Sequence, residues 1–173
     1  NRHVDPDDPR TEKKWELLND KRFRKALSLA INRRDIIDAI YDGIGEPAQV
    51  APGRDSYFYH EEMQKGYTEY DPDRANQIFD EIGLIGRDSE GYRTFKDGTR
   101  MVWCLDLIPN FADGPSSFII EDWKKVGIHA IEQEISFNLF NVEHLARKHD
   151  FFVWGEGGGF NPVLKSYGFL PMW

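Results

Sequence analysis

The sequence contains a single cysteine, Cys104, among 173 residues, so the chain cannot form an internal disulfide. Cys104 lies within an apolar run, which favours a buried, small hydrophobic side chain. No apolar run approaches the roughly 20 residues that a membrane-spanning helix needs. The first residues lack both an initiator Met and the basic-then-apolar plan of a signal peptide. We therefore expect a processed or excised piece, and the missing targeting signals do not locate it in the cell.

Positive charge is also scarce, because 22 Lys and Arg face 30 Asp and Glu, for a net charge of −8. Proteins that bind nucleic acid gather basic residues to replace counterions, so no nucleic-acid partner is expected. The one basic cluster, residues 21–25, has apolar neighbours at helical spacing and is predicted to be a solvated helix face. The length and the 40% hydrophobic share are typical of one globular unit with a single core.

Catalytic and metal-binding motifs are absent. The glycine-rich stretch at residues 155–160 has Phe where a dinucleotide fingerprint needs its third glycine, and no Gly-Lys-Ser/Thr loop occurs. His60 begins a zinc-protease-like motif, but Gln64 replaces the second histidine. His144 and His149 are five residues apart, which predicts two surface histidines rather than ligands of one metal. Acidic pairs are adjacent in sequence and point apart. We predict no catalytic residue, no metal site and no cofactor.

Three helices are predicted in the first half, over residues 20–31, 32–43 and 71–83, because apolar residues recur there at helical spacing. Each begins at a side chain that caps helices, namely Asp20, Asn32 and Asp71. Between the second and third helices, residues 43–70 are rich in glycine, proline and tyrosine. A loop of this length is often functional. Tyr57 and Phe58 are candidate ligand contacts, with packing beneath the loop as the alternative.

The second half has the pattern of a sheet. Asp97-Gly98 predicts a β-hairpin over residues 92–107. Its second arm, Met101–Leu107, is almost wholly apolar, as a strand buried on both faces would be. A helix from Pro115, a strand at 128–134, a helix at 137–147 and a strand at 150–154 follow. This alternation is typical of a parallel sheet with right-handed crossovers, and Trp103 and Trp123 are predicted to be core residues.

In such sheets, ligands gather where loops leave the carboxyl ends of the strands. Two exits carry the candidate ligand-binding residues. The first contributes Asn110 and Phe111, and the second contributes Trp154, Glu156, Gly157, Gly158 and Phe160. Glycines let a ligand approach the backbone, and aromatic walls make a good small-molecule surface. A plain flexible turn at the second exit is the alternative.

Residues 20–43 (DKRFRKALSLAINRRDIIDAIYDG) resemble a motif of the oligopeptide/dipeptide-type solute-binding proteins that serve ABC importers. Residues 70–75 (YDPDRA), 88–98 (DSEGYRTFKDG) and 123–128 (WKKVGI) are similar to later segments of the same family, in the same order. Gly158 stands where peptide-binding members carry an aspartate, and Glu156 is the nearby acid that could substitute for it. This departure leaves both a peptide and an oligosaccharide as candidate ligands.

The resemblance implies a periplasmic-binding-protein-like α/β lobe: a central, mainly parallel sheet flanked by helices, plus a β-hairpin. Residues 1–173 would form this single lobe, with a helical part at 17–83, the hairpin at 92–107 and a βαβαβ part at 100–160. The lobe would be the second, post-hinge half of a two-lobe protein. Its expected partners are a small-molecule ligand, the missing first lobe and ABC permease subunits. A periplasmic or membrane-anchored extracytoplasmic location and no enzymatic activity follow from the same resemblance.

Two other functions remain open at this point. The chain could be an independent α/β enzyme domain of unrecognised chemistry, or an interaction domain that binds no small molecule. An enzyme should bring titratable groups together at the strand ends, whereas a binding lobe should present aromatics, glycines and amides there. The sequence shows the second pattern in the loops at residues 109–111 and 154–162.

Overall fold

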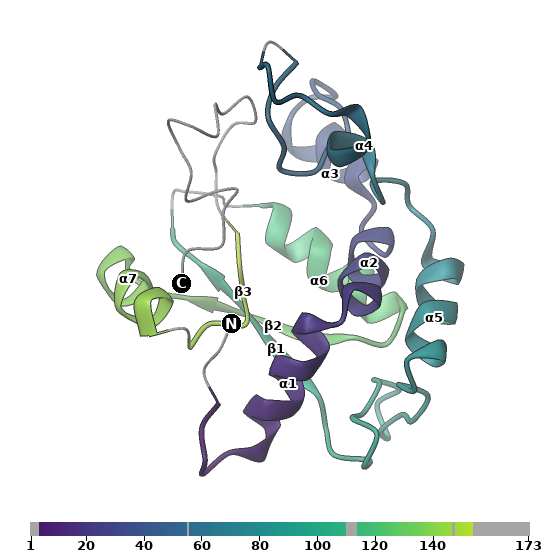
Figure 1. The fold of residues 1–173 in the computed structure, drawn as a ribbon, viewed down its shortest axis with the longest axis vertical. Coiled ribbons are helices and arrows are strands. Elements are labelled where there is room, and N and C mark those ends of the chain that lie inside the picture. The colour runs from purple at the N-terminus through teal and green to yellow at the C-terminus, as the bar shows by residue number, and fades with distance from the viewer. Residues whose placement is uncertain (1–3, 55, 110–113, 147, 154–173) are drawn as a thin grey trace.

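The computed structural model describes residues 4–54, 56–109, 114–146 and 148–153 (Figure 1). Within these ranges the elements in chain order are α1 (Pro9–Asn19), α2 (Lys21–Leu29), α3 (Arg33–Ile40), α4 (Glu61–Lys65), α5 (Pro72–Glu81), β1 (Val102–Leu107), α6 (Pro115–Lys125), β2 (His129–Glu134), α7 (Phe137–Ala146) and β3 (Phe151–Phe152). Across these described segments, every helix is too short or too polar to cross a membrane.

The three strands form one parallel sheet in the order β2-β1-β3. β1 pairs with β2 from Val102 opposite His129 to Leu107 opposite Glu134, and with β3 at Leu105 opposite Phe151. The predicted parallel sheet, with its central strand at Met101–Leu107, is therefore confirmed.

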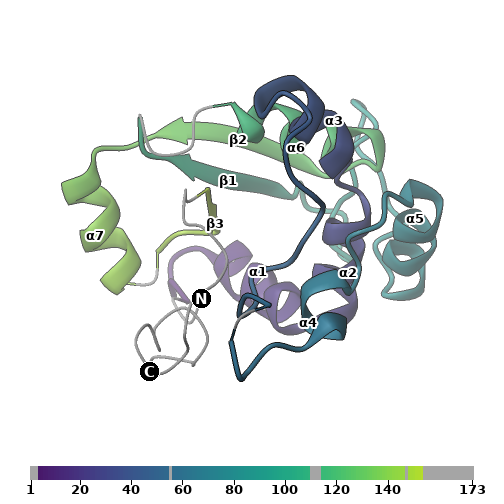
Figure 2. The ribbon, with the colours of Figure 1, turned by 90° about the horizontal axis from the view of Figure 1, so that it is seen from above.

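Helices cover the sheet from opposite faces, as the alternation of side chains on β3 shows. The Phe151 ring lies 5.1 Å from that of Trp123 on α6. The next residue, Phe152, faces the other way, and its ring lies 5.2 Å from that of Phe140 on α7. In both Figure 1 and Figure 2, α5 and α7 stand at opposite ends of the molecule.

The main core lies on the α6 side of the sheet. Trp103 is fully buried, and its ring centroid lies 5.3 Å from that of Phe23 on α2. Phe23 in turn meets Phe79 on α5 edge-to-face. Trp123 is 5% exposed and donates from Nε1 to the carbonyl of Leu27 at 3.1 Å. Both tryptophans are core residues, as predicted, and each joins the helical half to the sheet.

Capping side chains set the helix starts. Asp20, Asn32 and Asp71 each accept a hydrogen bond from a backbone N–H in the first turn of α2, α3 and α5, as the sequence predicted. The sequence interpretation missed α1, although Asp8 and Pro9 supply the same cap and first-turn proline as Asp71 and Pro72. None of the α1 residues is buried, so an apolar stripe was not available to reveal the helix.

The expectation that β1 is buried on both faces holds only near the end of the strand, where Asp106 is buried on the face opposite Leu105 and Leu107. Trp103, Leu105 and Leu107 are buried, but Val102 and Cys104 on the other face are only partly covered. Cys104 is therefore a half-buried thiol rather than an enclosed one. Residues 43–70 also differ from the expectation of an irregular loop, because α4 lies within them.

The chain reverses before β1 at the Asp97-Gly98 turn, where Gly98 adopts a φ of 83°. The two arms join by an antiparallel bridge between Thr94 and Arg100. Arg93, 1% exposed, anchors this segment. Its guanidinium donates to the carbonyl of Val126 at 2.9 Å and to Oδ1 of Asp80 at 2.6 Å. The hairpin is thus tied to α5 and to the end of α6.

Candidate ligand-binding site

The candidate residues at the strand exits lie outside the residues that the structure describes. They are Asn110, Phe111, Trp154, Glu156, Gly157, Gly158 and Phe160. The strands that precede them end side by side. The backbone N–H of Val153, just after β3, donates to the carbonyl of Asp106 near the end of β1 at 3.1 Å. The ligand-contacting role of these residues stays a prediction.

Tyr57 and Phe58 lie at the tip of the aromatic loop (residues 43–70). The Tyr57 side chain is 96% exposed and that of Phe58 is 47% exposed. The two rings meet edge-to-face with centroids 5.4 Å apart. Packing beneath the loop is therefore wrong for Tyr57, and the pair forms an exposed aromatic surface of the kind that ligands use.

Polar contacts hold the base of the aromatic loop. The Gln49 side-chain amide donates to the Ser28 hydroxyl at 2.8 Å and to the Gly66 carbonyl at 3.0 Å. Glu46 forms ion pairs with Lys65 at 2.8 Å and with Arg54 at 3.2 Å. The loop is thus fastened to α2 while its aromatic tip projects into solvent.

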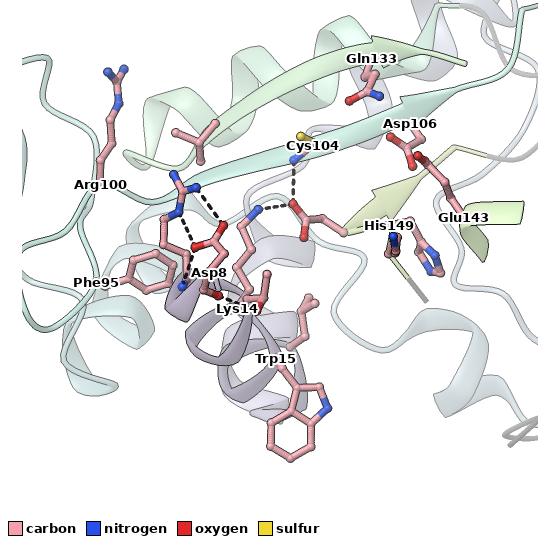
Figure 3. Close-up of a pocket in the computed structure, with 16 residues that line it drawn as sticks. Asp8, Lys14, Trp15, Phe95, Arg100, Cys104, Asp106, Gln133, Glu143 and His149 are labelled. Carbon is pink, nitrogen blue, oxygen red and sulfur yellow. Dashed lines mark hydrogen bonds and ion pairs between the residues drawn. The ribbon is translucent and has the colours of Figure 1, made fainter. Parts of the chain in front are cut away.

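A groove of about 400 Å³ lies on the α7 side of the sheet (Figure 3). α1, β1, α7 and the turn before β3 contribute most of its lining. Its polar lining residues include Asp8, Arg10, Lys14, Arg100, Cys104, Asp106, Gln133, Glu143, Lys148, His149 and Asp150. Sequence reasoning did not find this groove, because its residues come from segments that are far apart in the chain.

Titratable groups converge in this groove, on the face of the sheet that Cys104 and Asp106 share, whereas the strand-exit loops to which the sequence interpretation referred lie almost wholly outside the described residues. Asp106 on β1, Glu143 on α7 and Asp150 before β3 line one groove. Burial, with the nearby charges of Glu143 and Asp150, raises the pKa of Asp106 to about 6. Burial and the charge of Asp150 also raise the pKa of the Cys104 thiol, so Cys104 is not an activated nucleophile.

Of the two predicted surface histidines, His144 is exposed and His149 is partly buried, and the two rings contact each other. α7 ends at Ala146, and the chain turns back so that the His149 ring stacks on that of His144 at 4.9 Å. Burial, followed by the charge of His144, lowers the pKa of His149. Within the described part of the chain, no three His, Cys, Asp or Glu side chains are placed to hold a metal ion.

Comparison with known proteins gives a consistent result. Residues 9–170 match the family "Bacterial extracellular solute-binding proteins, family 5 Middle". The chain is 27% identical to the oligopeptide-binding protein AppA of Bacillus subtilis over 89% of this chain and 28% of AppA. It is 31% identical to the oligopeptide-binding protein OppA of Lactococcus lactis subsp. cremoris over 74% of this chain and 22% of that protein.

Solved structures share the fold. A chain described as oligopeptide-binding protein OppA superposes with a TM-score of 0.85 and 33% identity over 91% of this chain and 25% of that chain. The periplasmic binding protein MelB of Agrobacterium fabrum, solved with stachyose, superposes with a TM-score of 0.69 at 21% identity over 84% of this chain and 23% of MelB. The chain spans about a quarter of the length of these relatives. It belongs to family 5 of the bacterial extracellular solute-binding proteins, and its sequence matches the middle part of that family.

Proposed function

We propose that this chain forms one ligand-contacting lobe of an extracytoplasmic solute-binding protein that delivers a peptide or an oligosaccharide to an ABC importer. The family match over residues 9–170 is the observation that carries the proposal. The relatives named as oligopeptide-binding are three to five times as long as the matched region, as their covered shares of 28% and 22% imply. A second lobe would supply the rest of the binding surface, and permease subunits would receive the solute.

The fold supports this proposal. Parallel strands present their carboxyl ends at one edge, and ligands of open α/β sheets bind there. β1 and β3 end together at that edge, immediately before the two predicted ligand-contacting stretches. In our proposal, Trp154 stacks on the solute, Glu156 accepts a hydrogen bond from an amine or hydroxyl, and Gly157 and Gly158 admit the solute close to the backbone.

The chemistry is binding and release, with no covalent step. Closure of two lobes around a solute buries it and orders the contacts that one lobe alone cannot make. A periplasmic or membrane-anchored location outside the cytoplasm follows from the same role. Both peptide and oligosaccharide remain candidate solutes, because stacking aromatics and a single acidic acceptor suit either.

Substitutions of Trp154 and Glu156, the proposed ligand-contacting wall, test the function in the protein expressed from its complete gene. Calorimetric titration with peptide and oligosaccharide panels should give tight binding of one class. Trp154→Ala and Glu156→Gln should weaken that binding, by about 2 kcal/mol for the tryptophan, and should leave the Tm of the empty protein nearly unchanged.

Trp103→Ala is the matched control, because Trp103 is fully buried and its loss should lower the Tm. Unchanged affinity in both wall variants would place the contact surface elsewhere, and absence of binding to either solute class would contradict the proposed function.

A further inference from the structure

Asp106 is a buried carboxylate whose position needs explanation. The residue is 3% exposed, and its Oδ2 atom has no hydrogen-bond partner among the described residues. A buried carboxylate normally pairs with a cation or accepts hydrogen bonds, because desolvation otherwise disfavours its charge. Gln133 on the neighbouring strand stands opposite Asp106 in the β1–β2 register, but its side chain donates no hydrogen bond to the Asp106 Oδ2 atom.

A second carboxylate lies close to Asp106. Figure 3 shows the Glu143 side chain extending from α7 toward Asp106 across the groove. The charge of Glu143 contributes to raising the pKa of Asp106, second only to burial, and that of Asp150 follows. Two carboxylates that share a site repel each other unless a proton or a cation lies between them.

The cations that line the groove are mostly engaged elsewhere. Lys14 pairs with Asp150, and Arg10 pairs with Asp8 at 2.8 Å. Arg100 pairs with Glu90 at 3.0 Å. Lys148 also lines the groove, but its side chain is exposed and no ion pair is recorded for it among the described residues. Asp106 and Glu143 therefore line the groove as two acids that form no ion pair among the described residues.

We propose that this groove binds an organic cation, an ammonium or guanidinium group, between Asp106 and Glu143. The volume of about 400 Å³ accommodates such a group with part of its stem, and the described residues provide no three-ligand set for a metal ion. The cation has two possible sources: the amine of a free solute, or a Lys or Arg side chain from elsewhere in a longer polypeptide. The proposal does not depend on the solute-transport function.

Carbon-detected NMR of the Asp106 carboxyl group in the 173-residue chain tests the proposal. The pH titration is done with n-butylammonium chloride and with sodium chloride at equal ionic strength. A bound ammonium favours the ionised form, so the pKa of Asp106 should fall from about 6 toward the ordinary value near 4 in the amine alone. In the Asp106→Asn variant the Glu143 carboxyl signal, followed by the same NMR method, should show no saturable change as the amine is added. Glu143→Gln should weaken amine binding about five-fold.

Glu132→Gln is the matched control. Glu132 is an exposed acid that stands opposite Leu105 in the β1–β2 register, so its side chain lies on the face of the sheet away from Asp106. It should leave amine binding unchanged. A tripeptide with a free amino terminus, compared with its N-acetylated form, distinguishes the sources. Much tighter binding of the free amine than of n-butylammonium indicates a solute amine, whereas equal binding indicates a side chain of the longer polypeptide.

Two results would overturn the proposal. In the first, the pKa of Asp106 is the same in both salts, or the amine response survives in Asp106→Asn. In the second, the amine binds only after Lys148→Met, which would mean that Lys148 already supplies the cation in solution.

Discussion

The carboxylate of Asp150 accepts a hydrogen bond from the backbone N–H of Cys104 at 3.0 Å. β3 contains two residues, so its backbone cannot pair with β1 at this level, and the Asp150 side chain satisfies the donor instead. The same carboxylate binds Lys14 from α1. One side chain thus ties the central strand, the short edge strand and the first helix together.

Removing that carboxylate should loosen the α7 side of the sheet. Asp150→Ala should lower the free energy of unfolding by about 2 kcal/mol, because a partly buried N–H and Lys14 both lose their acceptor. Asp150→Asn, which keeps an acceptor oxygen, should cost less. Urea unfolding measures both, and a loss below about 0.5 kcal/mol for the alanine variant would show that the contact is dispensable.

Arg93 should be among the most sensitive positions in the chain. Arg93→Met removes the donors to the carbonyls of Val126 and Leu84 and to the Asp80 carboxylate. We expect a loss of about 3 kcal/mol in urea unfolding, since buried acceptors would be left unpaired. The matched control is Arg74→Met, because Arg74 forms an exposed pair with Glu69 at 3.4 Å. That variant should change stability by less than about 0.5 kcal/mol, and equal effects in the two variants would contradict the structure.

Stability should depend on pH through Asp106. Its pKa is about 6 in the folded chain and near 4 when unfolded, so the folded state binds the proton more tightly. The resulting stabilisation is present below about pH 4 and is lost as the pH rises through about 6.

Asp106→Asn cannot ionise and should therefore be more stable than the native chain by roughly 2 kcal/mol near pH 8, with the difference disappearing near pH 4. Thermal unfolding at the two pH values measures this. A variant that is equally or less stable than the native chain at the higher pH would show that the carboxylate is already compensated.

The aromatic loop should contribute to binding rather than folding. Tyr57→Ala should change the free energy of unfolding by less than about 0.5 kcal/mol, because the ring is 96% exposed. In the complete protein it should weaken solute binding by about 1 kcal/mol if the tip contacts the solute. The comparison variant is Phe23→Ala, which empties a fully buried position and should cost about 3 kcal/mol or more of stability. Equal solute affinity with and without the Tyr57 ring would remove the loop tip from the site.

Much of the fold could be predicted from local patterns. Asp20, Asn32 and Asp71 are capping residues whose signals are complete within a few positions, and the alternating strands and helices after residue 100 specify a parallel sheet. The sequence interpretation missed α1 because an apolar periodicity arises where one face of a helix is buried, and none of the α1 residues is buried. Its cap and proline were the available signal.

The groove could not be predicted in the same way. Asp106, Glu143 and Asp150 meet because β1, α7 and the turn before β3 pack together, and sequence spacing carries no information about that contact. The stacking of His144 on His149 depends on where α7 ends, which a helical-spacing argument ignores. Tyr57 was identified as a candidate from composition, but its exposure required coordinates.

Calorimetry on two polypeptides tests the central claim most directly: the 173-residue chain alone and the protein expressed from its complete gene. If this chain is one lobe of a two-lobe solute-binding protein, the complete protein binds a peptide or an oligosaccharide tightly, and the chain alone binds the same solute at least about a hundred-fold more weakly, because closure supplies the remaining contacts. Equal affinity in the two polypeptides would contradict the claim.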